Sequence, residues 1–179
     1  MSNGLYLNFE NRVVGGSQVP IPIYSATLQK ILAGKPCGGA VLKDGIYIKS
    51  RQSDDVITGS NYGDFIQAGD GDDIINSSSG DNTIRAGQGD DFITLGKGEN
   101  LLHYSRDLLK SQHDTITNFD DNDRIVIDRS LEALVTLDGV GSSSLQIKVA
   151  NQGLNKGDNS VVSSLSFDSD ITDKQISFL

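Results

Sequence analysis

A nine-residue repeat between residues 50 and 103 constrains the fold of this chain more than any other feature. Written in nines from Ser50, the sequence reads SRQSDDVIT, GSNYGDFIQ, AGDGDDIIN, SSSGDNTIR, AGQGDDFIT and LGKGENLLH. The glycine content argues against a helix, and a nine-residue period with one apolar residue per short strand is typical of a solenoid in which each coil uses two repeats. We therefore expect the aliphatic residues of the eighth position to form the core: Ile57, Ile66, Ile75, Ile84, Ile93 and Leu102.

Two other positions of the repeat carry chemistry. The sixth position is an oxygen donor in every repeat, as Asp55, Asp64, Asp73, Asn82, Asp91 and Asn100. Glycine recurs at the second position (Gly69, Gly87, Gly96) and at the fourth (Gly71, Gly80, Gly89, Gly98). Glycine at a fixed turn position permits a positive φ and lets backbone carbonyls point at a ligand. The pattern predicts turns that present both side-chain and backbone oxygens.

The negative charge of the chain is concentrated in the repeats. Residues 54 to 100 hold ten acids and two bases, a net charge of −8, out of −9 for the whole chain. A segment with this much self-repulsion should be unfolded unless cations neutralise it, and about four divalent ions would do so. A solvated acidic linker is the alternative, but a linker would show no repeat. Nucleic acid is disfavoured as a partner because the chain has no basic stripe.

The repeat resembles the RTX (repeat-in-toxin) nonapeptide G-G-x-G-x-D-x-U-x, a haemolysin-type calcium-binding repeat, most closely in AGDGDDIIN and AGQGDDFIT. It is also similar to the repeats of alginate epimerase R-modules. The resemblance implies an all-β fold, a parallel β-roll or right-handed β-solenoid. In such a roll the first six residues of each repeat form a turn and the last three a strand, and Ca²⁺ lies between turns that are two repeats apart.

Carried over to this chain, the resemblance implies two stacks of turns with different ligand sets. One stack has Asp55, Asp73 and Asp91 with the carbonyls of Gly69, Gly71, Gly87 and Gly89; the other has Asp64, Asn82 and Asn100 with Gly80 and Gly98. Calcium affinity rises with ligand charge, so the first stack should bind more tightly. On the second stack Asp81 and Glu99, one place before the two Asn residues, offer substitute carboxylates.

The segments outside the repeats are predicted to be strand-rich. Residues 114–128 (DTITNFDDNDRIVID) resemble the segment that follows the repeats in RTX proteins, which implies Asp114 as a further ligand; an ordinary strand start is the alternative. Residues 134–149 and 160–179 alternate apolar and polar residues, which predicts strands. We expect an N-terminal cap over 1–49 with a possible short helix at 25–32, a β-roll over 50–103, and a closing β extension over 104–179.

Catalytic motifs are missing from the sequence. It contains no H-E-x-x-H, no G-x-S-x-G and no Walker-type loop, and His103 and His113 have no cysteine or third histidine nearby. Acidic pairs such as Asp72 and Asp73 repeat too regularly for one active site, so metal ligation explains them better than a glycosidase dyad. We therefore expect a non-enzymatic protein; an enzyme with its site in residues 1–49 is the weakest alternative.

The function hypothesis is a calcium-binding module that folds on binding the ion and is structural, adhesive or surface-associated. The N-terminus lacks the basic and apolar regions of a cleavable signal, and no apolar run could span a membrane. The resemblance then implies a secreted, extracellular bacterial protein that leaves the cell by a type I route. The alternative is a carbohydrate-binding accessory module of a polysaccharide-modifying enzyme, for which Arg106, Lys110, Arg124 and Arg129 are suggestive but scattered. Besides calcium, these hypotheses name polysaccharide or cell-surface components as partners. The oligomeric state stays open.

Overall fold

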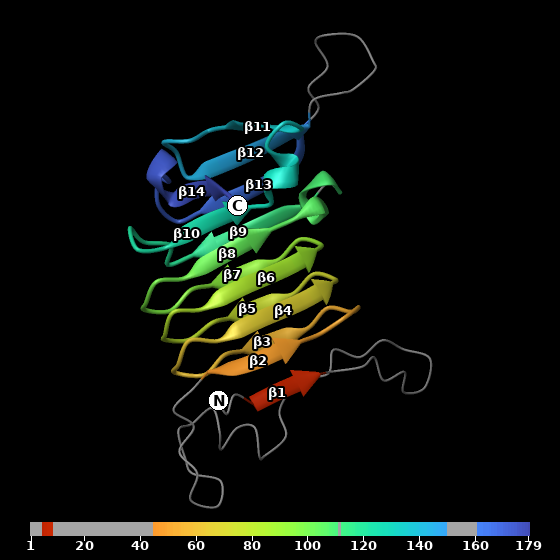
Figure 1. The fold of residues 1–179 in the computed structure, drawn as a ribbon, viewed down its shortest axis with the longest axis vertical. Coiled ribbons are helices and arrows are strands. Elements are labelled where there is room, and N and C mark those ends of the chain that lie inside the picture. The colour runs from red at the N-terminus through yellow and green to blue at the C-terminus, as the bar shows by residue number, and fades with distance from the viewer. Residues whose placement is uncertain (1–4, 9–44, 111, 150–160) are drawn as a thin grey trace, which may run out of the picture.

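The chain forms a roll of two facing parallel sheets (Figure 1). The structure, a computed structural model, describes residues 5–8, 45–110, 112–149 and 161–179. Within them, two seven-stranded sheets run in the orders β1-β2-β4-β6-β8-β10-β14 and β11-β12-β13-β9-β7-β5-β3. We call them the β4 sheet and the β5 sheet. The fold is an all-β parallel β-roll, as the repeat predicts.

Successive repeats place their strands in opposite sheets. Odd repeats supply β3 (Val56–Thr58), β5 (Ile74–Asn76) and β7 (Phe92–Thr94), and even repeats supply β4 (Phe65–Asp70), β6 (Thr83–Gln88) and β8 (Leu101–Tyr104). Neighbours within a sheet are parallel and two repeats apart, so that Ile57 lies opposite Ile75 and Ile66 opposite Ile84. The expected coil of two repeats is confirmed.

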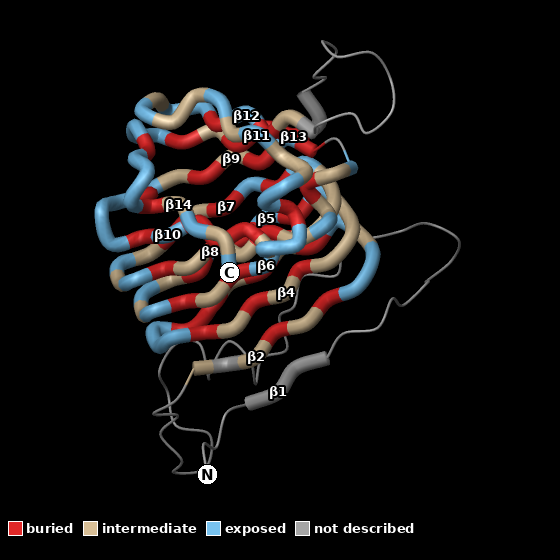
Figure 2. The backbone as a smooth tube through the Cα atoms, turned by 45° about the horizontal axis from the view of Figure 1, so that its top comes forward, coloured by how far each residue is buried: buried red, intermediate tan, exposed pale blue. Residues whose placement is uncertain are grey.

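The eighth position of the repeat fills the space between the sheets. Its six aliphatic side chains are each at most 1% exposed, whereas the seventh-position Ile74 is 51% exposed on the outer surface. Figure 2 shows the alternation as buried segments along the middle of each strand, with exposed turns at the edges. Each buried aliphatic side chain contributes about 1.5–3 kcal/mol. The aliphatic ladder predicted from the sequence is therefore the core of the roll.

Both sheets continue beyond the repeats. At one end β2 (Ile46–Lys49) pairs with β4, and β1 (Leu5–Asn8) pairs with β2. At the other end β9 (His113–Thr117) follows β7, and β10 (Arg124–Ile127) follows β8. The 3-10 helix η1 (Arg106–Leu109) lies between β8 and β9 and lengthens the spacing between stacked turns from 18 to 23 residues. The coil geometry thus extends past the last recognisable repeat.

The C-terminal strands close the roll. β13 (Val161–Phe167) pairs in parallel with β9, and β14 (Ile176–Phe178) with β10; the 3-10 helices η2 (Arg129–Leu131) and η3 (Asp173–Gln175) lie in the connections. β12 (Ser144–Val149) is antiparallel to β13, and β11 (Val135–Asp138) is antiparallel to β12. The strands predicted over 134–149 and 160–179 are confirmed where the structure describes them.

One expectation for the N-terminal segment falls on residues that the structure does not describe. The short helix predicted at 25–32 lies outside the described residues. The division into segments 1–49, 50–103 and 104–179 stays a prediction, and the β4 sheet runs without interruption across residues 50 and 103.

Candidate metal centre

The turns of the roll form two stacks, one at each edge of the sheets. One stack connects the β4 sheet to the β5 sheet and carries Asp55, Asp73 and Asp91, and we call it the Asp side. The opposite stack carries Asp64, Asn82 and Asn100, and we call it the Asn side. All six side chains are buried. The structure therefore groups the sixth-position residues as the two expected stacks.

On the Asp side the sixth-position carboxylates form a continuous ladder. The backbone N–H of Asp55 donates to Oδ1 of Asp73 at 2.8 Å, and that of Asp73 donates to Oδ1 of Asp91 at 2.9 Å. The N–H of Asp91 donates to Oδ1 of Asp114 at 3.3 Å, which adds Asp114 as the fourth member. Hydroxyl groups bind the two ends, because Ser50 donates to Asp55 and Tyr104 donates to Asp114. The sequence reasoning identified Asp114 but neither hydroxyl partner.

Within the described residues, the middle of this ladder holds buried negative charge that no hydrogen-bond donor compensates. Oδ2 of Asp73 and Oδ2 of Asp91 are buried and have no hydrogen-bond donor within the described part of the chain. Burial raises the pKa of Asp73 to about 8, and the nearby carboxylates of Asp91 and Asp55 contribute to the rise. Burial and the charge of Asp114 raise the pKa of Asp91 to about 7. These two carboxylates need a cation if they are to stay ionised in the folded protein at neutral pH.

Backbone carbonyls accompany these carboxylates. Gly69, Gly71, Gly87 and Gly89 have positive φ angles between 123° and 133°. A Cβ on Gly87 would lie 1.7 Å from the carbonyl oxygen of Gly69, and a Cβ on Gly89 would lie 2.2 Å from that of Gly71. The carbonyls of one turn thus face the glycines of the next turn at a distance that excludes any side chain. The turns therefore stack backbone against backbone, with oxygen atoms between them.

The donor set of the Asp side matches a hard cation. Among the described residues no three His, Cys, Asp or Glu side chains converge on one point, and His103 and His113 join no such cluster. A site here would combine one or two carboxylates with backbone carbonyls. Calcium takes such mixed oxygen sets, whereas zinc sites use nitrogen and sulfur ligands.

The Asn side forms a similar ladder with a different composition. The N–H of Asp64 donates to Oδ1 of Asn82 at 2.9 Å, and the N–H of Asn100 donates to Oδ1 of Asp123 at 3.0 Å. Gly80 and Gly98 have φ angles of 111° and 137°, and a Cβ on Gly98 would lie 2.4 Å from the carbonyl oxygen of Gly80. The backbone stacking is therefore the same on both sides, and the difference lies in the sixth-position side chains.

Asp123 is the ladder residue that the sequence reasoning missed. It is buried, and burial raises its pKa above the usual value. A signal existed, because Asp114 and Asp123 each precede an isoleucine by two residues, as Asp73 and Asp91 do. The insertion before β9 hides this continuation from a strict nine-residue count.

Fifth-position acids line the outside of the turns. The carboxylates of Asp54 and Asp72 accept the backbone N–H of Asp72 and Asp90 at 2.9 and 2.8 Å, and that of Asp81 accepts the N–H of Glu99 at 2.9 Å. All five residues are exposed. Asp81 and Glu99 therefore point away from the buried Asn side, and the structure does not place them as substitutes for the missing sixth-position carboxylates.

Comparison with known families identifies the repeat. The family model of the RTX calcium-binding nonapeptide repeat, in four copies, matches residues 52–84 and 76–102. The match covers the turns of both stacks from the first coil to β8. A search of curated proteins found no match to the chain.

Proposed function

We propose that this chain, which carries RTX calcium-binding nonapeptide repeats, is a secreted, non-enzymatic module whose roll folds when it meets extracellular calcium. One observation carries the proposal: the buried ladder of Asp55, Asp73, Asp91 and Asp114, with two carboxylate oxygens that have no donor among the described residues. Ions held between turns by these carboxylates and by the carbonyls of Gly69, Gly71, Gly87 and Gly89 would supply the missing positive charge.

The physical basis is the coupling of metal binding to folding. Each repeat contributes one or two aliphatic side chains to the core. This gain is small, and it is opposed by the burial of several like charges. A site that exists only in the folded state adds its binding free energy to the stability of that state. Extracellular calcium modules bind with dissociation constants of about 10⁻⁴–10⁻³ M, far above calcium levels inside cells. We therefore propose that the repeats stay unfolded before export and fold outside.

The proposed location and role rest on the repeat family. We propose a bacterial extracellular protein exported by a type I route, with a structural or adhesive role at a surface. In the part of the chain that the structure describes, no helix is both long enough and apolar enough to cross a membrane.

Matched pairs of carboxylates test the proposed sites. The double variant D73N/D91N removes two buried ladder charges, and D72N/D90N removes two exposed charges from adjacent positions. Circular dichroism of the full chain is followed from EDTA into millimolar calcium, with magnesium at equal concentration as the ion control. We expect the parent and D72N/D90N to gain strand signal with calcium and D73N/D91N to need much more calcium. A strand signal in EDTA equal to that in calcium would contradict the proposal.

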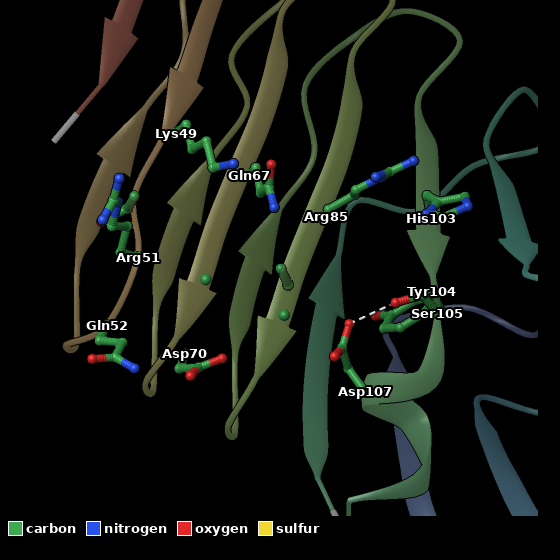
Figure 3. Close-up of a pocket in the computed structure, with 14 residues that line it drawn as sticks. Lys49, Arg51, Gln52, Gln67, Asp70, Arg85, His103, Tyr104, Ser105 and Asp107 are labelled. Carbon is green, nitrogen blue, oxygen red and sulfur yellow. Dashed lines mark hydrogen bonds between the residues drawn. The ribbon is translucent and has the colours of Figure 1, made fainter. Parts of the chain in front are cut away.

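A groove on the outer surface of the β4 sheet supports carbohydrate binding as a second candidate function. The groove has a volume of about 730 Å³, and its lining includes Lys49, Gln67, Arg85 and His103. Gln67, Arg85 and His103 occupy the last position of alternate repeats, and Lys49 occupies the equivalent position of β2; Figure 3 shows the four in a row across neighbouring strands. Arg51 adds a cation, and Asp70 and Asp107 line the same groove.

Aromatic rings extend this surface. The rings of Tyr47 and Phe65 stack at 4.9 Å, and the guanidinium of Arg85 lies 5.7 Å from the centre of the Phe65 ring. Cations next to half-buried rings on a strand surface suit an acidic polysaccharide, with carboxylates on the cations and sugar rings on the aromatic face. The cations of this face come from the repeats and β2, and not from the scattered Arg106, Lys110, Arg124 and Arg129.

Binding to a polyuronate tests this second function. We expect the full chain in calcium to bind a soluble polyuronate but not neutral dextran by titration calorimetry, and K49Q/R85Q to weaken binding at least about tenfold. The control R129Q removes an exposed cation on η2, outside the groove, and should change nothing. Equal binding by K49Q/R85Q and the parent would exclude the groove as the site.

A further inference from the structure

The side-chain amides of the Asn side donate hydrogen bonds to the backbone oxygens of its turns. Nδ2 of Asn82 donates to the carbonyl of Gly80 at 2.8 Å and to Oδ1 of Asn100 at 2.9 Å. Nδ2 of Asn100 donates to the carbonyl of Gly96 at 3.0 Å and to Oδ1 of Asp123 at 2.9 Å. Each amide therefore connects a carbonyl of its own turn to the side chain of the next turn.

These carbonyls are the counterparts of those assigned to calcium on the Asp side. Gly80 occupies the fourth position of its repeat, as Gly71 and Gly89 do, and Gly96 occupies the second, as Gly69 and Gly87 do. An ion between turns of the Asn side would need the same carbonyl lone pairs that accept the amide hydrogens. The amide group and a calcium ion would thus compete for the same oxygens.

The acids at the two ends of the Asn side also have donors. Asp64 accepts the hydroxyl of Ser60 at 2.7 Å and the N–H of Ser60 at 2.5 Å. Oδ2 of Asp123 accepts the N–H of Asp120 at 2.9 Å. Among the described residues, the buried polar atoms without a partner include oxygens of Asp73 and Asp91 but no atom of Asn82 or Asn100. The Asn side is satisfied by the protein alone, and the Asp side is not.

We propose that the Asn side holds its turns together without calcium, and that the amides of Asn82 and Asn100 take the place that ions occupy on the Asp side. This inference rests on the proposed function, in which the Asp side binds calcium. An ion on the Asn side would have to displace four amide hydrogen bonds, and the sixth-position oxygens of Asn82 and Asn100 that it would gain are neutral. Calcium affinity falls as ligand charge is lost, so the exchange is unfavourable.

The inference has two consequences for the whole roll. Calcium binding is confined to the three steps of the Asp-side ladder. Asn82 and Asn100 become stabilising residues whose contribution does not depend on calcium, although the resemblance alone counts them among the ligands.

A matched pair of variants tests the inference in the full chain. Asp73→Ala and Asn82→Ala each remove the side chain of a middle turn, one on each side. Native mass spectrometry at saturating calcium should show at least one ion fewer for Asp73→Ala and an unchanged number for Asn82→Ala. Urea unfolding should show Asn82→Ala destabilised equally at low and saturating calcium. If the parent binds calcium as expected and Asn82→Ala binds one ion fewer, the inference is overturned and the proposed function stands. A parent that binds no calcium would overturn both.

A measurement on the parent protein covers the case in which Asn82→Ala does not fold. The side-chain amide protons of Asn82 and Asn100 can be followed by ¹⁵N NMR in saturating calcium. Because both groups are buried and hydrogen bonded, we expect their exchange with solvent to be slowed at least about tenfold relative to the exposed Asn61. Exchange as fast as that of Asn61 would mean that an ion or water has displaced the amide bonds, and would overturn the inference.

Discussion

The Asp side and the Asn side of the roll have the same backbone arrangement. They differ in how the buried sixth-position side chains obtain their partners. Both stack glycine turns so closely that a Cβ would meet a carbonyl of the preceding turn. On the Asp side the sixth-position groups are carboxylates, and the central oxygens need an external cation. On the Asn side, Asn82 and Asn100 carry NH₂ in place of one carboxylate oxygen, and this group supplies internal donors. Under our proposal, a single repeat therefore encodes either a metal-dependent or a metal-independent turn, and the exchange of one carboxylate oxygen for NH₂ decides which.

The largest expected effect concerns the core that both sides share. Ile75→Ala leaves a cavity between the sheets, where Ile75 is 0% exposed, and should cost about 2–5 kcal/mol of unfolding free energy. Because this loss is independent of the turns, it should be equal with and without excess calcium in any condition where the chain is folded. Urea unfolding measures it, and a neutral substitution at both Ile75 and Ile93 would show that this row does not form the core.

Glycine substitutions compare the backbone stacking of the two sides. Gly89→Ala and Gly98→Ala each place a Cβ at positive φ, within 2.4 Å of a carbonyl oxygen. Each should lose about 1–3 kcal/mol of stability through backbone strain. Calcium titration separates them, because Gly89→Ala disturbs the Asp side and should lower calcium affinity, whereas Gly98→Ala should leave it unchanged in the folded protein. Equal losses of affinity would contradict the division between the sides.

Exchanging the sixth-position residues should move calcium affinity in opposite directions. Asp73→Asn keeps the side-chain shape and removes one charge next to two steps of the ladder, so affinity should fall at least about tenfold, the factor that corresponds to 1.4 kcal/mol. Asn82→Asp replaces the donor amide by a carboxylate, so it should create calcium binding on the Asn side and weaken folding in chelator. Titration calorimetry on both variants decides the matter; unchanged affinity in Asp73→Asn would remove this residue from the ligand set.

The sequence predicted the coil, the core and the two stacks because each depends on a strict nine-residue spacing. Ile57, Ile66 and Ile75 fall in the core for that reason. Asp123 was not predicted because an insertion before β9 interrupts the nine-residue spacing. The donor role of the Asn82 amide could not be inferred, since it depends on distances to carbonyls of particular turns. Tyr104 and Ser50 were missed for the same reason, because their hydrogen bonds to Asp114 and Asp55 depend on distances that the motif does not specify.

The last expected effect is a pH dependence of stability that runs in opposite directions without and with calcium. The pKa values of Asp73, Asp91 and Asp114 in the folded state, about 8, 7 and 6, lie above their ordinary value of 3.8. The folded state therefore binds more protons than the unfolded state between about pH 4 and pH 8, and its stability in chelator should rise as the pH falls through this range. Calcium should reverse the trend, because protons compete with the ion. Circular dichroism in EDTA at several pH values measures the effect: the strand signal should grow as the pH falls from 8 toward 4, and a strand signal that grows toward pH 8 would contradict it.

The most direct test of the difference between the two sides is a crystal structure of the full chain in calcium, with anomalous scattering recorded at a wavelength where calcium contributes. We predict anomalous peaks between the turns of Asp55, Asp73 and Asp91, and none between Asn82 and Asn100. Peaks of equal height on both sides would contradict the proposal that amides replace calcium, and the absence of peaks on the Asp side would contradict the assignment of the calcium sites themselves.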